Sequence, residues 1–535
     1  MEGTRAAVLP RRPLRISGGV AAALMVAALI ATVFWAILAA ATDAGGSVRP
    51  PDLAHLLRMT VLQAGLTTVV SLLVGTALAW SLNRLRFPGR SLLVGFFASA
   101  IVTPGLIVAF GLLAVWGRNG WINRAVESVF GTSLGTSIFG LGGIVFAHAI
   151  LDAAFAARVL LTRLEALPSA RLKTGQSLGL SAWQRFRILD WPALAGTLPG
   201  LAAIIFLLAF TSFPIVLVLG GGPANQTFEV AIYSAVRLDF DLRAAVILAL
   251  VQVAVCGAVI LSASAFSVIP SSLGPTGTQG WRDSRATQVL QWTVLLSCVL
   301  AFALPLLAVV VDGFGNGLPE LLGRPSFWAA SATSLVIATL SALLALVLAL
   351  LIAGARAASA SLPLRVGLGL PAYTYLAIPA IVLSLGFFLA IRAFGVLPSV
   401  AAGPVVILAN ALLALPFAVA TLGPPLEATV RGHGRLIRSL GLSGWMQWRF
   451  VEWPLIGREI GVVLALSFCF SLGDLGVIAL FGTESFSTLP LLMYRALGAY
   501  RSNDAASIAA LMLVLTVAVF TAFPYAFGRL ADARR

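Results

Sequence analysis

The sequence predicts an all-α membrane protein of about 12 transmembrane helices, arranged as two parallel six-helix repeats. Composition excludes an ordinary soluble globular protein, because 59% of the 535 residues are hydrophobic and only 10% are charged. Its uncharged apolar runs are long enough to cross the roughly 30 Å hydrocarbon layer as helices. A polar segment that occurs once in each half indicates an internal duplication.

Twelve apolar runs supply the predicted spans, six on each side of a polar seam. The first run, 17–41, follows several arginines as a signal peptide would, but it is longer than the roughly 7–15 residues of a signal sequence core. We therefore interpret it as a retained helix. The other spans are expected near 59–82, 92–116, 140–161, 196–219, 244–269, 287–311, 328–354, 366–391, 403–422, 460–482 and 505–528.

The distribution of lysine and arginine predicts the orientation, because these residues stay on the cytoplasmic side during insertion. With alternating loops, 25 of the 35 basic residues fall on the side of the N-terminus and 10 on the other side. Both termini are therefore predicted to be cytoplasmic. Short basic loops facing anionic lipid head groups account for the net charge of +15, so nucleic-acid binding is not expected.

The duplication is visible in SLGLSAWQRFRILDWP, residues 177–192, which returns as SLGLSGWMQWRFVEWP, residues 439–454. An offset of 262 residues relates the two copies, which we call the repeated loops. An even number of spans in each half makes both halves enter the membrane in the same direction, so the repeats are parallel.

A stretch rich in proline, glycine and serine lies between the halves and is expected to be a cytoplasmic linker. The predicted organisation is a cytoplasmic N-terminus 1–16, a first helix with a periplasmic loop 17–55, a first domain 56–269, the linker 270–288, a seventh helix with a periplasmic loop 289–327, a second domain 328–528 and a cytoplasmic C-terminus 529–535.

The sequence of each repeated loop predicts four elements in order: the end of a helix, a glycine turn, a short helix and the start of a new transmembrane helix. Gly179 and Gly441 stand where a chain turning between helices often needs a positive φ. Ser181 and Gln184 form a capping-box pattern that starts the short helix. Ser443 starts the second copy without the matching glutamine.

Each copy ends in an acid, a tryptophan and a proline, at 190–192 and 452–454. The acid is expected beside the positive end of the next helix, since the helix dipole favours negative charge there. Pro192 and Pro454 fit the first turn of that helix, where a missing backbone N–H costs little.

Aromatic residues three positions apart lie on one face of each short helix. An aromatic pair beside an arginine on a cytoplasmic surface suits insertion into a groove of a partner protein. The alternative is that these rings lie in the lipid head-group region. Two copies at identical spacing favour docking, and the residues concerned are Trp183, Phe186 and Arg187 with Trp445, Trp448 and Arg449.

The pattern G-x-S-x-W-x-x-[FW]-x-x-[IV]-x-W-P after a cytoplasmic helix resembles the EAA loop of ABC importer permeases. In that family the loop docks on a separate ATPase subunit. The sequence departs from the family at the head of the pattern, where 173–175 and 435–437 contain no glutamate. The coupling residues that the resemblance implies are Gly179, Ser181, Trp183, Phe186, Arg187, Pro192, Gly441, Ser443, Trp445, Trp448, Arg449 and Pro454.

Further stretches resemble the permease subunits of bacterial importers of thiamine and thiamine pyrophosphate. They are RFPGRSLL at 86–93, GRNGW at 117–121, LGGGP at 219–223, GWRD at 280–283, VDG at 311–313, PAIVLSLGFF at 379–388, SLGDLGVIALFG at 471–482 and GAYRSNDAA at 498–506. The resemblance implies the type I ABC importer permease fold, with 56–269 and 328–528 as its permease domains. It also implies a bacterial inner-membrane location, two copies of an ATPase subunit and a periplasmic binding protein.

Two alternatives to a thiamine importer stay open. Fused permeases for ferric iron share much of this outline, so ferric iron or another small cation is the second substrate class. A self-sufficient secondary transporter also often has twelve spans in two parallel halves, but its halves lack a matched docking loop after the fourth span.

No reaction chemistry is expected in this chain. A P-loop needs Gly-Lys followed by Ser or Thr, and the one lysine, Lys173, follows a leucine. We therefore expect no cofactor bound by the chain, and ATP and Mg used by the partner ATPase, so the chain is not an enzyme by itself. The histidines and cysteines are single and far apart, which gives no metal-site spacing.

Two acids within the predicted spans are candidates for the substrate pathway, since ionisable groups are costly in a membrane. Asp152 and Asp474 each belong to one half and have no acidic counterpart in the other. Thiamine is a cation with aromatic rings, which carboxylates and aromatic side chains attract. The alternative is structural, with the acids capping a broken helix or pairing with Arg158. The aromatic candidates are Phe210, Phe213 and Phe470.

Overall fold

The computed structural model describes residues 13–43, 52–132, 138–264, 283–315 and 317–533. Within these ranges the chain forms helices and no strand. Ten of the described helices are long and apolar enough to cross a membrane, and the number rises to 12 if each of two bent helix pairs is one span. The expected all-α class with about 12 spans is confirmed, and the chain is a multi-pass membrane protein.

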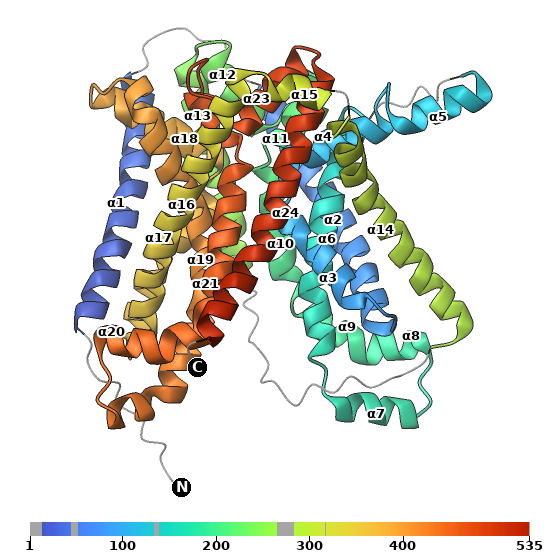
Figure 1. The fold of residues 1–535 in the computed structure, drawn as a ribbon, viewed down its shortest axis with the longest axis vertical. Coiled ribbons are helices and arrows are strands. Elements are labelled where there is room, and N and C mark those ends of the chain that lie inside the picture. Colours follow the sequence, from blue (N-terminus) through green and yellow to red (C-terminus); the bar gives the residue numbers. More distant parts are fainter. Residues whose placement is uncertain (1–12, 44–51, 133–137, 265–282, 316, 534–535) are drawn as a thin grey trace.

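The first repeat extends from α1 to α13 (Figure 1). Its elements are α1 (Pro13–Asp43), α2 (Leu53–Arg84), α3 (Arg90–Ala98), η1 (Ser99–Ile101), α4 (Gly105–Trp116), α5 (Trp121–Phe130), α6 (Leu141–Glu165), α7 (Ser169–Ser177), α8 (Ala182–Arg185), η2 (Phe186–Asp190), α9 (Trp191–Ala195), α10 (Leu198–Phe210), α11 (Pro214–Leu219), η3 (Pro223–Asn225), α12 (Phe228–Arg237) and α13 (Leu242–Ser264).

The second repeat extends from α14 to α24. Its elements are α14 (Arg285–Gly313), α15 (Gly317–Leu322), α16 (Pro325–Ala358), α17 (Leu362–Thr374), η4 (Tyr375–Ala377), α18 (Ala380–Ala393), α19 (Pro398–Ser439), α20 (Gly444–Gln447), η5 (Trp448–Glu452), α21 (Trp453–Leu472), α22 (Gly476–Phe481), α23 (Leu489–Gly498) and α24 (Ser502–Asp532). Most of the predicted linker 270–288, up to residue 282, lies outside the described residues.

Four of the expected spans are interrupted in the structure, namely 92–116, 196–219, 366–391 and 460–482. Proline explains three of the breaks, because it lacks an N–H and disfavours helical backbone in the residue before it. Pro104 precedes α4, Pro214 begins α11, and Pro379 precedes α18. The segment ending in η4 and α18 are bent by 102°. The fourth break lies at Gly473 and Asp474.

The first helix of each repeat packs against the other repeat. Helix α1 contacts α16, α17 and α18, whereas α14 contacts α2 and α4 as well as α24 of its own repeat. Glycine allows the close approach in both places, because Gly386 of α18 faces Val33 of α1 and Gly111 of α4 faces Pro305 of α14. Gly111 and Gly386 are equivalent in the duplicated sequence, so both repeats use the same packing device.

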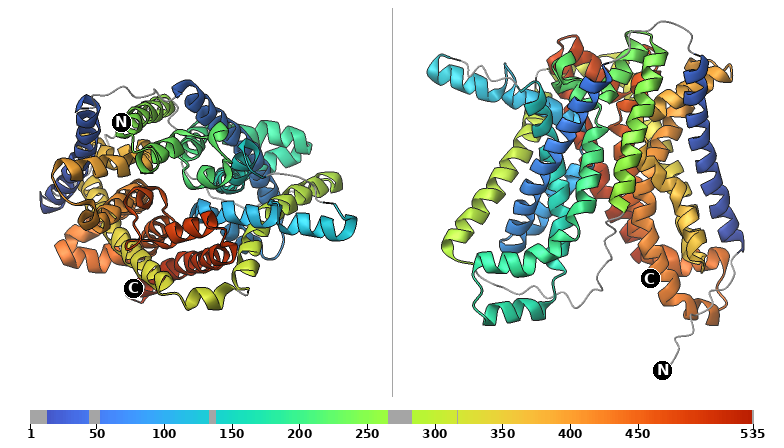
Figure 2. Two further views of the ribbon diagram at one scale, coloured as in Figure 1. Left: turned by 90° about the horizontal axis from the view of Figure 1, so that it is seen from above. Right: turned by 180° about the vertical axis from the view of Figure 1, so that it is seen from behind.

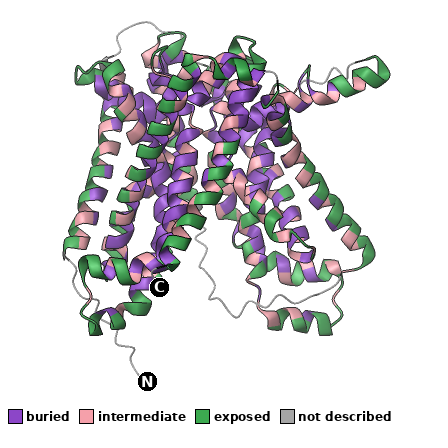
Figure 3. Ribbon diagram, viewed as in Figure 1, coloured by how far each residue is buried: buried purple, intermediate pink, exposed green. Residues whose placement is uncertain are grey.

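The helices of the two repeats lie close together near α12 and α23 and diverge toward α7 and α20 (Figures 1 and 2). We call the end that carries α7 and α20 the α7 face; the start of α1 and the end of α24 also lie there. Buried residues concentrate where helices meet, and exposed residues line the outer faces (Figure 3). The exposed residues include many large hydrophobic side chains, such as Leu24, Leu73 and Leu296, which fits contact with lipid.

Candidate functional site

Both repeated loops lie at the α7 face, and each begins with the same glycine turn. Gly179 has φ of 66° and Gly441 has φ of 62°, which confirms the expected positive φ. In the first turn, Leu180 N–H donates to Gly175 C=O at 3.2 Å and Gly179 N–H donates to Gln176 C=O at 3.1 Å. This pair of bonds is a Schellman motif, and it closes the C-terminal end of α7.

The second turn has the same bonds at the C-terminal end of α19. Leu442 N–H donates to Ile437 C=O at 3.0 Å, and Gly441 N–H donates to Arg438 C=O at 3.1 Å. Helix α19 continues without a break through the region that corresponds to α6 and α7. Pro168 separates α6 from α7 in the first repeat, and Val430 occupies the equivalent position of the second repeat.

The start of the short helix differs between the copies. Ser181 and Gln184 form the expected capping box, with Ser181 N–H donating to Gln184 Oε1 at 2.9 Å. Ser443 precedes α20 but its side chain makes no cap hydrogen bond. Met446 stands at the position of Gln184 and cannot complete a capping box, so the first copy has the more strongly specified helix start.

Each short helix continues into the next helix through a π turn, η2 or η5, rather than ending before it. Pro192 and Pro454 lie in the first turn of α9 and α21, as expected. The preceding acids stand directly before α9 and α21, as expected, but they do not cap these helices. Asp190 and Glu452 have helical backbone and make no cap hydrogen bond, and both are buried in ion pairs.

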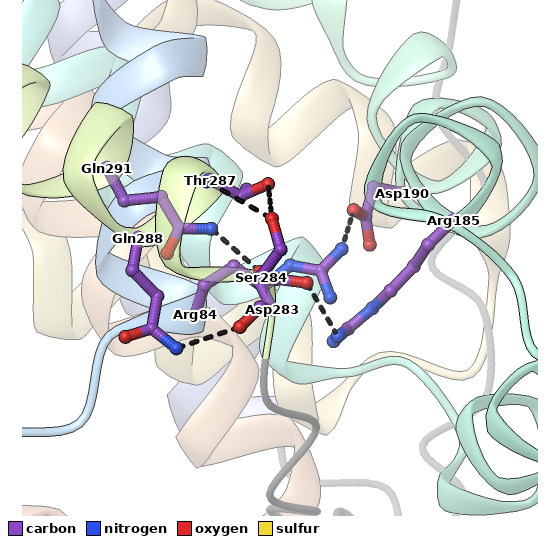
Figure 4. A network of polar contacts seen from close by, with 8 residues as sticks. All are labelled: Arg84, Arg185, Asp190, Asp283, Ser284, Thr287, Gln288 and Gln291. Atoms are coloured by element: carbon purple, nitrogen blue, oxygen red, sulfur yellow. Dashed lines mark hydrogen bonds and ion pairs between the residues drawn. The ribbon is translucent and has the colours of Figure 1, made fainter.

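The first ion-pair cluster joins α2, η2 and the start of α14 (Figure 4). Arg84, the last residue of α2, donates to Asp190, and both side chains are almost fully buried. Arg185 Nη1 lies 4.0 Å from Asp283 Oδ1. Asp283 Oδ2 in turn accepts a hydrogen bond from Gln291 Nε2 of α14 at 2.7 Å.

The second cluster joins α1 to η5. Arg15 makes a two-point contact with Glu452, in which Nη1 donates to Oε1 at 2.7 Å and Nη2 donates to Oε2. Gln447 also donates to Glu452 Oε1. Arg185 and Gln447 occupy equivalent positions in the duplicated loops, so the two clusters share a plan and differ in chemistry.

The aromatic pairs of the repeated loops line two grooves beside the transmembrane helices. Trp183 and Phe186 stack with ring centroids 5.8 Å apart, and their groove of about 580 Å³ also has walls from α2 and α14. Trp445 and Trp448 line a groove of about 630 Å³ with walls from α1 and α16. Trp183 is 68% exposed and Trp445 is 69% exposed. Insertion of these rings into a partner stays a prediction, as does the head-group alternative.

The adjoining arginines of the short helices, Arg187 and Arg449, are exposed at the same face. Figure 1 shows that α7 lies farther from the membrane helices than α8 and α9 do. Helix α7 carries the Lys173 region that stands at the head of the repeated pattern, and most of its residues are exposed. A partner that approaches this face would therefore meet α7 before the aromatic residues.

Of the two candidate acids, Asp474 lies at the break between α21 and α22. Its carboxylate accepts hydrogen bonds from Gly476 N–H and Val477 N–H at 3.1 Å, which is the capping role given above as the alternative. The break also touches the other repeat, since a Cβ on Gly473 would lie 2.6 Å from Pro104. Asp474 is therefore placed where interrupted helices of the two repeats meet.

Asp152 is buried in α6, where its Oδ2 lies 3.6 Å from Nδ1 of His148. Arg158, the partner considered from the sequence, is exposed and bonds to Thr162 instead. The structure thus gives Asp152 a partner one helical turn away. Asp152 thus contacts His148 within α6, whereas Asp474 caps α22 in the other repeat.

The three aromatic candidates contact different rings. Phe210 and Phe213 are buried, and Phe213 packs against Tyr233 with ring centroids 5.3 Å apart. Phe470 is half-buried and meets Phe417 edge-on at 5.2 Å. Phe210 and Phe213 are thus part of the first repeat's packing, whereas Phe470 belongs to the second.

Sequence reasoning missed the acid Glu229, which lies in α12 and is fully buried. Its Oε1 accepts a hydrogen bond from Gln252 Nε2 of α13 at 2.9 Å. Helix α12 packs against α18 and α22 of the other repeat, so Glu229 lies near the contact between the repeats. A single acid in the apolar stretch FEVAIYSAV was the available signal.

The chain is similar along almost its whole length to proteins described as thiamine transport system permease protein ThiP. The Salmonella typhimurium protein is 39% identical over 521 residues, covering 96% of this chain and 97% of that protein. The Brucella melitensis protein is 36% identical over 511 residues, 94% of each chain. The Haemophilus influenzae protein is 32% identical over 528 residues, 95% of this chain and 96% of that one.

A shorter similarity links the chain to the molybdenum transport system permease protein ModB of Haemophilus influenzae. The two are 31% identical over 170 residues, which cover 31% of this chain and 72% of that protein. No protein-family model matches the chain.

Proposed function

The chain belongs to the family of thiamine transport system permease proteins, and we propose from this that it is the membrane subunit of an ATP-driven importer for thiamine or thiamine phosphates. The observation that carries the proposal is the similarity over more than nine-tenths of the chain, which includes both repeats. A cationic aromatic substrate is also compatible with a carboxylate at the break between α21 and α22.

The partners in this proposal are two copies of an ATPase subunit and one periplasmic binding protein. Two repeated loops at one face provide two equivalent docking positions, one for each ATPase copy. ATP and Mg are used by the ATPase, and this chain binds no cofactor itself. The binding protein delivers the substrate at the opposite face, where α12 and α23 lie.

The location in this proposal is the bacterial inner membrane, with the α7 face and both termini in the cytoplasm. The excess of lysine and arginine on that side supports this orientation. The repeats diverge toward the α7 face (Figure 1), so an ATPase dimer bound there could draw the two repeated loops together. The substrate would then pass between the repeats.

Reconstitution tests the proposal. Proteoliposomes that contain the permease, its ATPase and the binding protein should accumulate thiamine only when ATP is present on the α7 side. Parallel assays with thiamine monophosphate, thiamine pyrophosphate and ferric iron identify the substrate. Accumulation of thiamine by the permease alone, driven by an ion gradient, would contradict the ATP-driven mechanism.

Asp474→Asn should lower thiamine uptake about tenfold, which corresponds to about 1.4 kcal/mol. Asparagine retains a side-chain oxygen for the N–H groups of Gly476 and Val477, so it removes the negative charge while keeping a cap. Uptake at several thiamine concentrations measures the effect, and co-purification of the ATPase should be unchanged.

Two further variants separate charge from helix capping. Asp474→Ser introduces the residue found at the equivalent position 212 of the first repeat, and it should also lose uptake although serine can cap a helix. Glu484→Gln changes an exposed acid in the neighbouring loop and should transport normally. Normal uptake by Asp474→Asn would remove Asp474 from the substrate pathway.

A further inference from the structure

The first helix of each repeat touches the other repeat at two heights. Helix α1 meets Gly386 of α18 through Val33 and reaches η5 through Arg15. Helix α14 meets Gly111 of α4 through Pro305, and Asp283 just before α14 reaches Arg185. Each first helix therefore connects a repeated loop with a helix that follows a proline break in the same repeat as that loop.

The ion pairs at the α7 face join segments that are distant in sequence. Arg15 and Glu452 are 437 residues apart, and Arg84 and Asp190 are 106 residues apart. Glu452 and Asp190 are both buried inside π turns. A two-point contact between arginine and a carboxylate fixes the relative orientation of its partners as well as their distance.

At this face each repeat also has one ion pair that joins two of its own helices. Arg90 Nη2 of α3 lies 2.8 Å from Glu165 Oε1 of α6, and Arg365 of α17 contacts Glu427 of α19 in the same way. These two pairs are equivalent in the duplicated sequence. They connect helices of one repeat, so they serve as matched controls for the contacts between a first helix and the opposite repeated loop.

We propose that the contacts Arg15–Glu452 and Asp283–Arg185, the latter supported by Arg84–Asp190, are positioning contacts that clamp each repeated loop to the first helix of the other repeat. When the ATPase displaces one repeated loop, the transmembrane helix that follows this loop and the first helix of the other repeat then move together. The inference rests on the proposed function, because the displacement comes from the ATPase. It assigns to the first helices a role in transmitting motion, in addition to their role as anchors in the membrane.

The Arg15 contact gives the sharper test, because Arg15 is half-exposed and its replacement leaves the core of α1 intact. Proteoliposomes with the ATPase and the binding protein are assayed for both ATP hydrolysis and thiamine uptake. Arg15→Gln should lower the thiamine imported per ATP about tenfold, within the range by which substitutions change coupling between sites. Arg15→Lys keeps the charge but loses the two-point contact, so it should give an intermediate value.

The charge-swapped variant Arg15→Glu with Glu452→Arg restores an opposite-charge pair and should recover at least half of the wild-type uptake per ATP. The control Arg365→Gln should leave the ratio of uptake to hydrolysis unchanged, even if it lowers stability. A wild-type ratio in both Arg15→Gln and Arg15→Lys would overturn the proposal. If the wild type hydrolyses ATP but imports no thiamine, the proposed substrate fails and the second measurement below decides.

A distance measurement tests the clamp without any substrate. Spin labels at Leu24 of α1 and Leu440 beside the second glycine turn occupy sites that are 65% and 62% exposed, in a variant whose three cysteines are replaced by alanine. In the wild type bound to its ATPase, this distance should stay the same with and without ATP. In Arg15→Gln it should change on ATP addition. An equally constant distance in Arg15→Gln would overturn the proposal.

Discussion

Gly111→Val should lower the free energy of unfolding of the permease by about 3 kcal/mol, the upper part of the range for overpacked cores. A Cβ atom at this position would lie 2.5 Å from the backbone oxygen of Pro305 and 2.9 Å from its carbonyl carbon. These atoms belong to the backbone of α14, so the helix itself has to move away from α4. Thermal unfolding of the purified protein in detergent, together with its amount in the membrane, measures the loss.

Two variants show whether the loss comes from the contact between the repeats. Gly95→Val lies on α3, in the same expected span, and outside its own helix no atom of the described residues lies within 4 Å of its Cβ position, so its stability should match the wild type. Gly386→Val should be destabilising as well, since its Cβ would lie 2.4 Å from a methyl group of Val33. Adding Val33→Ala removes that methyl group and should recover part of the loss. If Gly111→Val is as stable as the wild type, α14 does not pack closely against α4 at this position.

Features that depend on neighbouring residues in the sequence were predicted well. Hydrophobic run length predicted the fold class, because crossing the hydrocarbon layer imposes a minimum length on each helix. The glycine turns and the Ser181 capping box were predicted because their bonds join residues a few positions apart. The prolines of both repeated loops also lie in the first turn of a helix, as expected.

Features that depend on distant contacts were not predicted. The sequence shows acids at 190 and 452, but their partners Arg84 and Arg15 come from helices whose position is set by tertiary packing. The packing of each first helix against the other repeat has no local signal, since small residues are enriched at helix–helix interfaces in membranes whichever helix is the partner. Asp152 was given the wrong alternative partner for the same reason, because a contact within α6 to His148 competes with contacts to more distant arginines.

The helix interruptions occupy an intermediate position between these two groups. Pro104 and Pro379 are local signals for a break, yet prolines also occur inside the continuous helix α19. Within a membrane, an interrupted backbone is tolerated where protein or a water-filled cavity surrounds it. Whether a proline bends, breaks or merely enters a helix therefore depends on neighbouring helices that the sequence does not place.

Gly179→Val and Gly441→Val should uncouple ATP hydrolysis from uptake while the protein still inserts into the membrane. Both positions have a left-handed backbone, which costs an L-residue about 1–2 kcal/mol. Apart from the adjoining residues, no atom in the described part of the chain lies within 4 Å of either Cβ position, so the cost comes from the residue's own backbone and is relieved by rearranging the turn. Rearrangement would break the Schellman bonds that set the angle between α7 and α8, or between α19 and α20.

The expected magnitude is about a tenfold fall in thiamine imported per ATP, and matched variants separate backbone conformation from side-chain size. Gly179→Asn should retain most of the activity, because asparagine enters the left-handed region more easily than valine. Gly196→Val places the same side chain at a nearby glycine that has φ of −67° and open space, so it should be active. Efficient transport by both Gly179→Val and Gly441→Val would show that the turns do not transmit motion. Equal losses in Gly179→Asn and Gly179→Val would instead identify side-chain bulk at the docking surface as the cause.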